Sequence, residues 1–156
     1  MSSEESRAVE LLGRVPYGRL ATSMRALPFV APARHVVTGR CVLVRLHQGF
    51  GYHRACHGGV VAYEADNLAT GATTPWSVQF TGTAEVVEPT EDERAALGPA
   101  PVRVDGEPFV PVFLRITPQF VSVHVLEYAA GSATTPTAPA RTGSPDFTER
   151  HTRHAA

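Results

Sequence analysis

The residues best suited to chemistry lie in one stretch of the chain, residues 41–66. An apolar run is followed there by a loop with two glycines, Gly49 and Gly51, and then by a short polar segment, residues 52–57. Glycines allow successive backbone N–H groups to point toward one place, and a helix that begins after such a loop adds the positive end of its dipole. Arg54 supplies a side-chain donor beside them. The stretch therefore indicates a cradle for an anion such as a phosphate group, with a plain turn between two strands as the alternative.

Four side chains of the same stretch could bind a metal ion or ligate a haem iron: His47, His53, Cys56 and His57. Their spacing is not that of a zinc finger or a zinc ribbon, so we expect no metal site. Cys56 is expected to be exposed, whereas Cys41, in the apolar run, is expected to be a buried small hydrophobe. No Ser/His/Asp arrangement and no paired carboxylates stand out, so the sequence names no catalytic residue.

Composition limits the class of function. The 156 residues carry a net charge of −1, and all 14 basic side chains are arginines. This balance argues against nucleic acid as the main partner, because binding to a phosphate backbone needs a basic excess. The lack of lysine excludes Schiff-base chemistry. The N-terminus does not resemble a signal peptide and no apolar run approaches a membrane span, so we expect a cytoplasmic protein with reduced thiols and no membrane association.

The elements around these residues are expected to be mostly strands. A helix at residues 3–14 would be capped by Ser3, and short helices are expected at residues 52–57 and 89–97. The expected strands cover residues 19–23, 29–37, 41–46, 60–65, 76–88, 109–116 and 120–128. An antiparallel, closed or partly closed β-barrel with short helices buries such strands most economically. The barrel domain would comprise residues 1–130, and residues 131–156, rich in Pro, Ser, Thr and Gly, would form a flexible tail.

Five short motifs, in their order and spacing, resemble the pyridoxamine 5′-phosphate oxidase-like flavoproteins. The motifs are GRLAT at residues 18–22, VAP at 30–32, YEAD at 63–66, WSVQFTGTAEV at 76–86 and LRITP at 114–118. The resemblance covers roughly residues 9–125. It implies a split β-barrel, a homodimer, and two flavin sites built across the subunit interface. The implied function is that of a flavin-dependent oxidoreductase acting on a small molecule, with FMN or a deazaflavin as its cofactor.

The resemblance also implies which residues would contact the flavin. The glycine loop would receive the phosphate, residues of the first two strands would line the site, and two residues at the start of the strand at 76–88 would approach the ring from the partner subunit. These cofactor-binding candidates are Arg19, Ala21, Thr22, Arg34, Gln48, Gly49, Phe50, Gly51, Tyr52, His53, Arg54, Trp76 and Ser77. Trp76 could equally be a core residue, and Arg19, Arg34 or His35 could orient an anionic substrate.

One departure from the family pattern keeps other functions open. Flavin-binding members usually carry a Ser or Thr followed by Lys or Arg-Lys where this chain has Phe50 and Gly51. Arg54 could replace the missing lysine. The alternatives are a split-barrel dimer that has lost the usual FMN binding and holds haem or another small ligand, and a flavin-independent enzyme that uses the same cleft.

Overall fold

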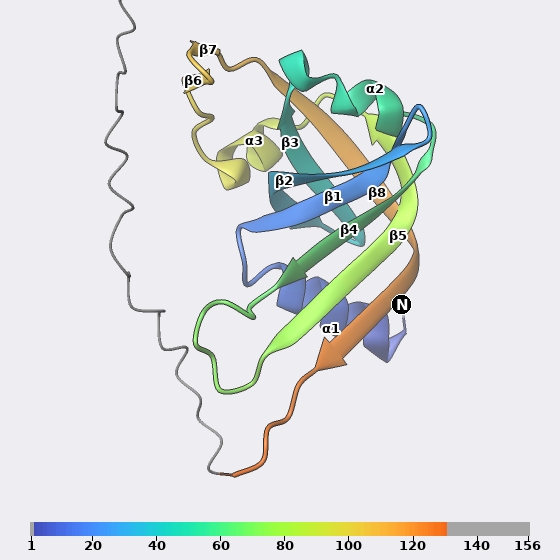
Figure 1. Ribbon diagram of the computed structural model, residues 1–156, viewed down its shortest axis with the longest axis vertical. Coiled ribbons are helices and arrows are strands. Elements are labelled where there is room, and N and C mark those ends of the chain that lie inside the picture. Colours follow the sequence, from blue (N-terminus) through green and yellow to red (C-terminus); the bar gives the residue numbers. More distant parts are fainter. Residues whose placement is uncertain (1, 131–156) are drawn as a thin grey trace, which may run out of the picture.

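Six antiparallel strands form a closed barrel in the computed structural model, which describes residues 2–130. Neighbouring strands follow the order β1-β2-β3-β8-β5-β4, and β4 pairs with β1 to close the barrel (Figure 1). The expected mainly-β, antiparallel barrel is confirmed. The expected tail, residues 131–156, lies outside the described residues. The barrel strands are β1 (Tyr17–Met24), β2 (Leu27–Thr38), β3 (Cys41–His47), β4 (Val60–Asp66), β5 (Trp76–Val86) and β8 (Pro111–Val125).

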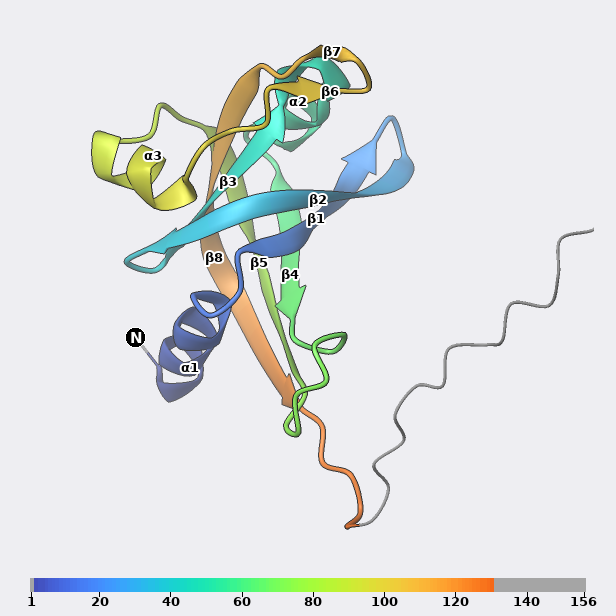
Figure 2. The same ribbon diagram turned by 90° about the vertical axis from the view of Figure 1, so that its left-hand side faces the viewer.

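Short helices and one small hairpin cover parts of the barrel. They are α1 (Ser3–Leu12), the 3-10 turn η1 (Gln48–Phe50), α2 (Tyr52–Cys56), α3 (Glu91–Leu97) and the paired two-residue strands β6 (Arg103–Val104) and β7 (Glu107–Pro108). Figures 1 and 2 show α1 and α2 at opposite ends of the barrel and α3 on its side. Within residues 2–130, no helix combines the length and the apolar character needed to cross a membrane.

The first helix is capped by Ser2, so the expectation that Ser3 caps it was wrong. The Ser2 hydroxyl accepts a hydrogen bond from the backbone N–H of Glu5 at 3.1 Å, and the Glu5 carboxylate accepts one from the backbone N–H of Ser2 at 3.0 Å. This reciprocal capping box needs a glutamate or glutamine three residues after the cap. Only Ser2 has one, because the residue three positions after Ser3 is Ser6.

The last two expected strands are in fact one continuous strand, β8. The break expected at Thr117 and Pro118 is absorbed by a bulge, since the pairing of β8 with β5 shifts register between Thr81 and Gly82. A bulge tolerates proline, which has no N–H to give to the ladder. Gly82 is needed opposite, because a Cβ there would lie 2.0 Å from the carbonyl oxygen of Thr117.

The barrel interior is filled by alternate side chains of the strands together with residues of α1 and α2. Cys56 belongs to this core and is fully buried, whereas Cys41 is half-buried, so the expectation for the two cysteines was wrong. The reason is that Cys56 stands on the side of α2 that packs against the core. Burial raises the pKa of the Cys56 thiol to about 11, which makes it a poor nucleophile.

His35 is also an interior residue, 1% exposed, and it cannot orient a substrate as the sequence suggested. Its Nε2 lies 2.9 Å from the carbonyl oxygen of Leu12, and its Nδ1 lies 2.6 Å from the hydroxyl of Tyr63. A carbonyl only accepts, so Nε2 carries the hydrogen and Nδ1 accepts from the tyrosine. The hydrogen bonds of His35 and Tyr63 connect the end of α1 to β2 and β4. They hold β2 in place, and Arg34, the residue before His35 on β2, faces the outside of the barrel.

Candidate functional site

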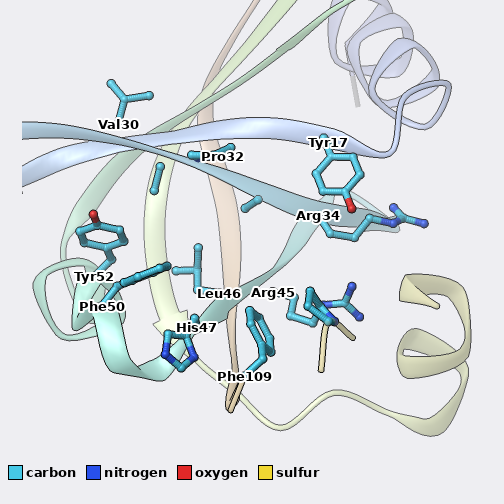
Figure 3. Close-up of a pocket in the computed structure, with 13 residues that line it drawn as sticks. Tyr17, Val30, Pro32, Arg34, Arg45, Leu46, His47, Phe50, Tyr52 and Phe109 are labelled. Carbon is cyan, nitrogen blue, oxygen red and sulfur yellow. The ribbon is translucent and has the colours of Figure 1, made fainter. Parts of the chain in front are cut away.

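The outer face of β1, β2 and β3 carries a cavity of about 430 Å³ (Figure 3). Register places Tyr17 of β1 opposite Arg34 of β2, and Arg34 opposite Arg45 of β3, so these side chains share one face of the sheet. The loop after β3 and the segment before β8 form the remaining walls. The volume lies within the range of small-molecule sites. The cavity is lined by Tyr17, Val30, Ala31, Pro32, Ala33, Arg34, Arg45, Leu46, His47, Phe50, Tyr52, Pro101 and Phe109.

A row of rings forms one wall of this cavity (Figure 3). The ring of His47 lies 5.2 Å from that of Phe109 and 5.0 Å from that of Phe50, and Phe50 lies 5.6 Å from Tyr52. Tyr52 stacks in turn on Phe29, with ring centroids 4.5 Å apart and planes inclined by 17°. These spacings are those of favourable aromatic pairs. The row therefore offers a firm apolar surface against which a planar ring could lie.

Backbone contacts hold this wall in place. The Nδ1 atom of His47 accepts a hydrogen bond from the N–H of Val110 at 3.1 Å, and the N–H of Gln48 donates to the carbonyl of Val110 at 2.8 Å. A Cβ at Gly49 would lie 2.4 Å from Nε2 of His47, so the close approach of the imidazole requires glycine. Gly51, with φ +73°, makes the left-handed turn into α2. The two glycines of the predicted cradle thus position the aromatic wall.

The opposite end of the cavity is cationic. Arg45 is only 8% exposed, and its guanidinium donates to the carbonyl oxygens of Gly98 at 2.8 Å and Pro99 at 3.2 Å. Arg34 donates to the carbonyls of Pro16 at 3.0 Å, Ala96 at 3.2 Å, and His35. Burial lowers the pKa of Arg45, and the neighbouring Arg34 charge lowers it further. No carboxylate is among the residues that line the cavity.

Of the thirteen cofactor-binding candidates, the cavity brings three together: Arg34, Phe50 and Tyr52. Gln48, Gly49 and Gly51 belong to the loop that supports its wall. Two further candidates flank this loop without lining the cavity: Arg54 is exposed, and His53 is buried with its Nδ1 atom unpartnered within the described part of the chain.

The other candidates lie elsewhere on the barrel. The guanidinium of Arg19 is ion-paired with Glu64 at 2.8 Å and with Asp66 at 2.7 Å. The pKa of Arg19 is raised, and the hydrogen bond to Asp66 is the largest cause. Trp76 is 6% exposed and belongs to the main core, which is one of the two roles that the sequence left open for it. Ser77, on β5, is the register partner of Asp66 on β4. The remaining two candidates, both on β1, are Ala21 and Thr22.

The histidines and the cysteine considered as ligands do not converge. His47 lines the cavity, His57 accepts from the N–H of Val86 at 3.0 Å, and Cys56 faces the core. Across residues 2–130, no group of three or more His, Cys, Asp or Glu side chains is arranged to hold a metal ion.

Sequence reasoning missed Arg45, a buried charged residue that lines the cavity. The available signal was an arginine inside the otherwise apolar run CVLVRLH. An arginine side chain is seldom buried unless another group pairs with its charge. Tyr17 and Phe109 were also missed, since nothing in their local sequence indicates that two segments far apart in the chain face one cavity.

Comparisons with known proteins agree with this architecture. The uncharacterized protein Rv0080 of Mycobacterium tuberculosis is 37% identical over 97 residues, which span 58% of this chain and 64% of that protein. The chain thus matches less than two thirds of this relative's length. Among solved structures, the FAD binding protein from Mycobacterium smegmatis superimposes with a TM-score of 0.61 at 23% identity, covering 83% of this chain and 98% of the other.

A haem binding protein from the same organism, M. smegmatis, has the same fold, with a TM-score of 0.58 at 15% identity over 81% of this chain and 59% of that one. These two structural likenesses establish a shared split-barrel fold. The sequence itself matches the family model described as "Pyridoxamine 5′-phosphate oxidase" over residues 4–125. With most of its length matched and the barrel in place, the chain belongs to the pyridoxamine 5′-phosphate oxidase family.

Proposed function

We propose that this protein is a flavin-dependent oxidoreductase that acts on a small molecule, with FMN bound in the cavity on β1–β3. The observation that carries the proposal is the cavity itself: a row of aromatic rings on one side, two arginines at the other end, and no carboxylate among its lining residues. A planar ring with an anionic tail matches this distribution. The solved FAD binding protein of the same fold supports the choice of a flavin.

The residues of the cavity fit such a cofactor in three ways. Phe50 and Tyr52 would contact the ring through their exposed faces, while Ala31 and Ala33 leave room for it because their side chains are small. When bound, a flavin supplies hydride-transfer chemistry, and the protein supplies orientation and electrostatics. Arg34 would orient an anionic group of the cofactor or the substrate.

The second part of the proposal is a homodimer in which the partner subunit covers the cavity. Three large apolar side chains are exposed on the β1–β2 hairpin beside it: Tyr17 is 60% exposed, Leu27 72% and Val30 63%. Exposed apolar side chains distributed along this hairpin favour a protein interface. A second copy of the chain could bring Arg19, Ala21, Thr22 or Ser77 near the ligand, as the family resemblance implies, whereas Trp76 is held in the core. Sedimentation of the full chain tests this, and a monomer at micromolar concentration contradicts it.

Titration with FMN, followed by quenching of flavin fluorescence, tests the cofactor. We expect saturable binding and a roughly three- to tenfold weaker affinity for Phe50→Leu, because a favourable ring contact contributes about 0.5–1.5 kcal/mol. Phe120→Leu is the matched control, since Phe120 is 73% exposed on β8 and does not line the cavity. Equal losses in the two variants, or no binding by the wild type, would contradict the proposal.

Haem is the second candidate ligand, and His47 is the observation that favours it. This histidine lines the cavity; because its Nδ1 accepts from the N–H of Val110, Nε2 carries the ring hydrogen, and ligation of a haem iron would require His47 to give up that hydrogen bond. The haem binding protein of the same fold supports the idea. Titration with haemin separates the candidates: a Soret band that is lost in His47→Ala but kept in His124→Ala would favour haem over FMN. A deazaflavin would be distinguished from FMN by direct competition between the two.

A further inference from the structure

One wall of the cavity has little that holds it to the barrel. Residues 99–110, which we call the β6–β7 segment, connect α3 to β8 and contain the hairpin of β6 and β7. Two of these residues, Pro101 and Phe109, line the cavity. Figures 1 and 2 show β6 and β7 at the same end of the barrel as α2, outside its wall of strands. No side chain of the segment is buried, and Val102 is 83% exposed.

The hairpin of this segment keeps its own shape. The N–H of Phe109 donates to the carbonyl of Val102 at 2.9 Å, and the guanidinium of Arg103 donates to the carbonyl of Gly106 at 2.8 Å. Asp105 and Gly106 form the turn, with φ of +50° and +81°. An Asp-Gly pair with positive φ at both residues is typical of a tight hairpin turn. The hairpin can therefore move as one unit.

The segment is attached to the barrel at its two ends. At one end, the guanidinium of Arg45 donates to the carbonyl of Pro99 at 3.2 Å. At the other end, Nδ1 of His47 accepts from the N–H of Val110 at 3.1 Å, and the N–H of Gln48 donates to the carbonyl of Val110 at 2.8 Å. Among residues 2–130, no other hydrogen bond and no ion pair joins the segment to the barrel.

The residue before the segment suits a hinge. Gly98 has φ +72° and ψ −175°, a backbone conformation that is essentially restricted to glycine. A Cβ at this position would meet nothing within 4 Å, so glycine is needed here for its backbone freedom and not for space. A segment that has no buried side chain and few bonds to its surroundings opens at a low cost in free energy, and the lids of ligand sites are of this kind.

We propose that the β6–β7 segment is a lid, which swings at Gly98 and Val110 to admit the ligand and closes with Phe109 beside it. Arg45 and His47 hold the two ends of the lid and also line the cavity, so a ligand that contacts either side chain acts on the attachment of the lid. That the ligand is FMN rests on the proposed function. The lid itself rests on the exposure and the attachments of the segment.

Limited digestion with trypsin tests the lid, because trypsin cuts after arginine and Arg103 is the only arginine of the segment. Arg25 is the reference site, since it is also exposed at a hairpin turn but lies between two long, fully paired strands. In the wild type, we expect cleavage after Arg103 to be roughly tenfold or more faster than after Arg25, with the sites identified from fragment masses. Saturating FMN should slow the cut after Arg103 and leave the cut after Arg25 unchanged.

Variants of His47 test the attachment at Val110. His47→Phe keeps a ring and removes the acceptor, and it should speed the cut after Arg103 roughly two- to tenfold, which is the change in open population that one neutral hydrogen bond controls. His47→Asn offers an amide oxygen as the acceptor and should stay close to the wild-type rate. His57→Phe is the matched control, because His57 also accepts a backbone N–H, that of Val86 at 3.0 Å, away from the segment.

Three results overturn the lid: cleavage after Arg103 no faster than after Arg25, equal effects of His47→Phe and His57→Phe, or bound FMN that gives no protection. If the wild type binds no FMN, the proposed function fails by itself. The digestions without ligand then decide: the lid stands if Arg103 is cut first and His47→Phe alone speeds that cut, and it falls if either is not observed.

Discussion

Replacing Tyr63 by phenylalanine removes one hydroxyl from the middle of the barrel. That hydroxyl lies 2.6 Å from Nδ1 of His35 and 3.2 Å from the carbonyl oxygen of Ala33. Tyr63 is fully buried and His35 is 1% exposed, so no water can replace the lost donor without opening the core. Because the hydroxyl has a single hydrogen, which it gives to Nδ1, the substitution leaves the imidazole Nδ1 without its donor.

The expected loss in the free energy of unfolding is about 1–3 kcal/mol, the usual penalty for a buried polar group left unpaired. The apolar ring is conserved in the variant, so no cavity larger than one oxygen atom adds to this figure. Urea denaturation at pH 8 measures it, because His35 is neutral there in both the folded and the unfolded chain. A Tyr63→Phe variant as stable as the wild type would refute the assigned hydrogen bond.

The same pair predicts how stability depends on pH. Burial lowers the pKa of His35 in the folded chain below its ordinary value of 6.5. Below pH 6.5 the unfolded chain therefore binds more protons than the folded chain, and stability falls as the pH falls. The slope is up to about 1.4 kcal/mol per pH unit until the folded pKa is reached. Above pH 6.5 the full stability is present.

The control for the pH dependence of stability is a histidine that is exposed, in contrast to the buried His35. Burial also lowers the pKa of His53, which contributes in the same direction. His35→Gln should therefore reduce the slope between pH 7 and pH 5 without abolishing it, whereas His124→Gln, at an exposed position on β8, should leave it as in the wild type. An unchanged slope in His35→Gln would show that this histidine already titrates normally in the folded chain.

Two backbone predictions complete the set. Gly82→Ala should lower the free energy of unfolding, measured by urea denaturation, by at least about 2 kcal/mol, because the new Cβ would lie 2.0 Å from a backbone oxygen of β8. Gly13→Ala is the control: its nearest contacts are at 3.5 Å, so it should change the free energy of unfolding by less than about 0.5 kcal/mol. A mild effect at position 82 would mean that the bulge relaxes. Ala26→Gly should raise Tm, corresponding to about 1 kcal/mol, because Arg25 and Ala26 turn the β1–β2 hairpin with φ of +52° and +65°. A lower Tm would contradict the strain assigned to this turn.

Strand periodicity and local signals in the sequence determined most of the architecture. The alternation along residues 76–86 and the apolar runs of β3 and β4 identify strands, because a strand with one buried face repeats every two residues. The family motifs then indicated a split barrel, and the structure supplied the order of its strands. Where the local interpretation was wrong, the cause was nonlocal: Pro118 continues a strand because β8 is bulged at Gln119, opposite Thr81 and Gly82 of β5.

The composition of the site was decided by the tertiary structure. The loop at residues 48–51 was visible in the sequence as a glycine-rich turn, yet its role as support for a ring wall depends on Val110, sixty residues away in the chain. Arg34 and Arg45 are eleven positions apart and become neighbours only through the pairing of β2 with β3. Whether an arginine faces solvent, a carboxylate or a cavity depends on which segments cover it, and a local pattern carries no information about that.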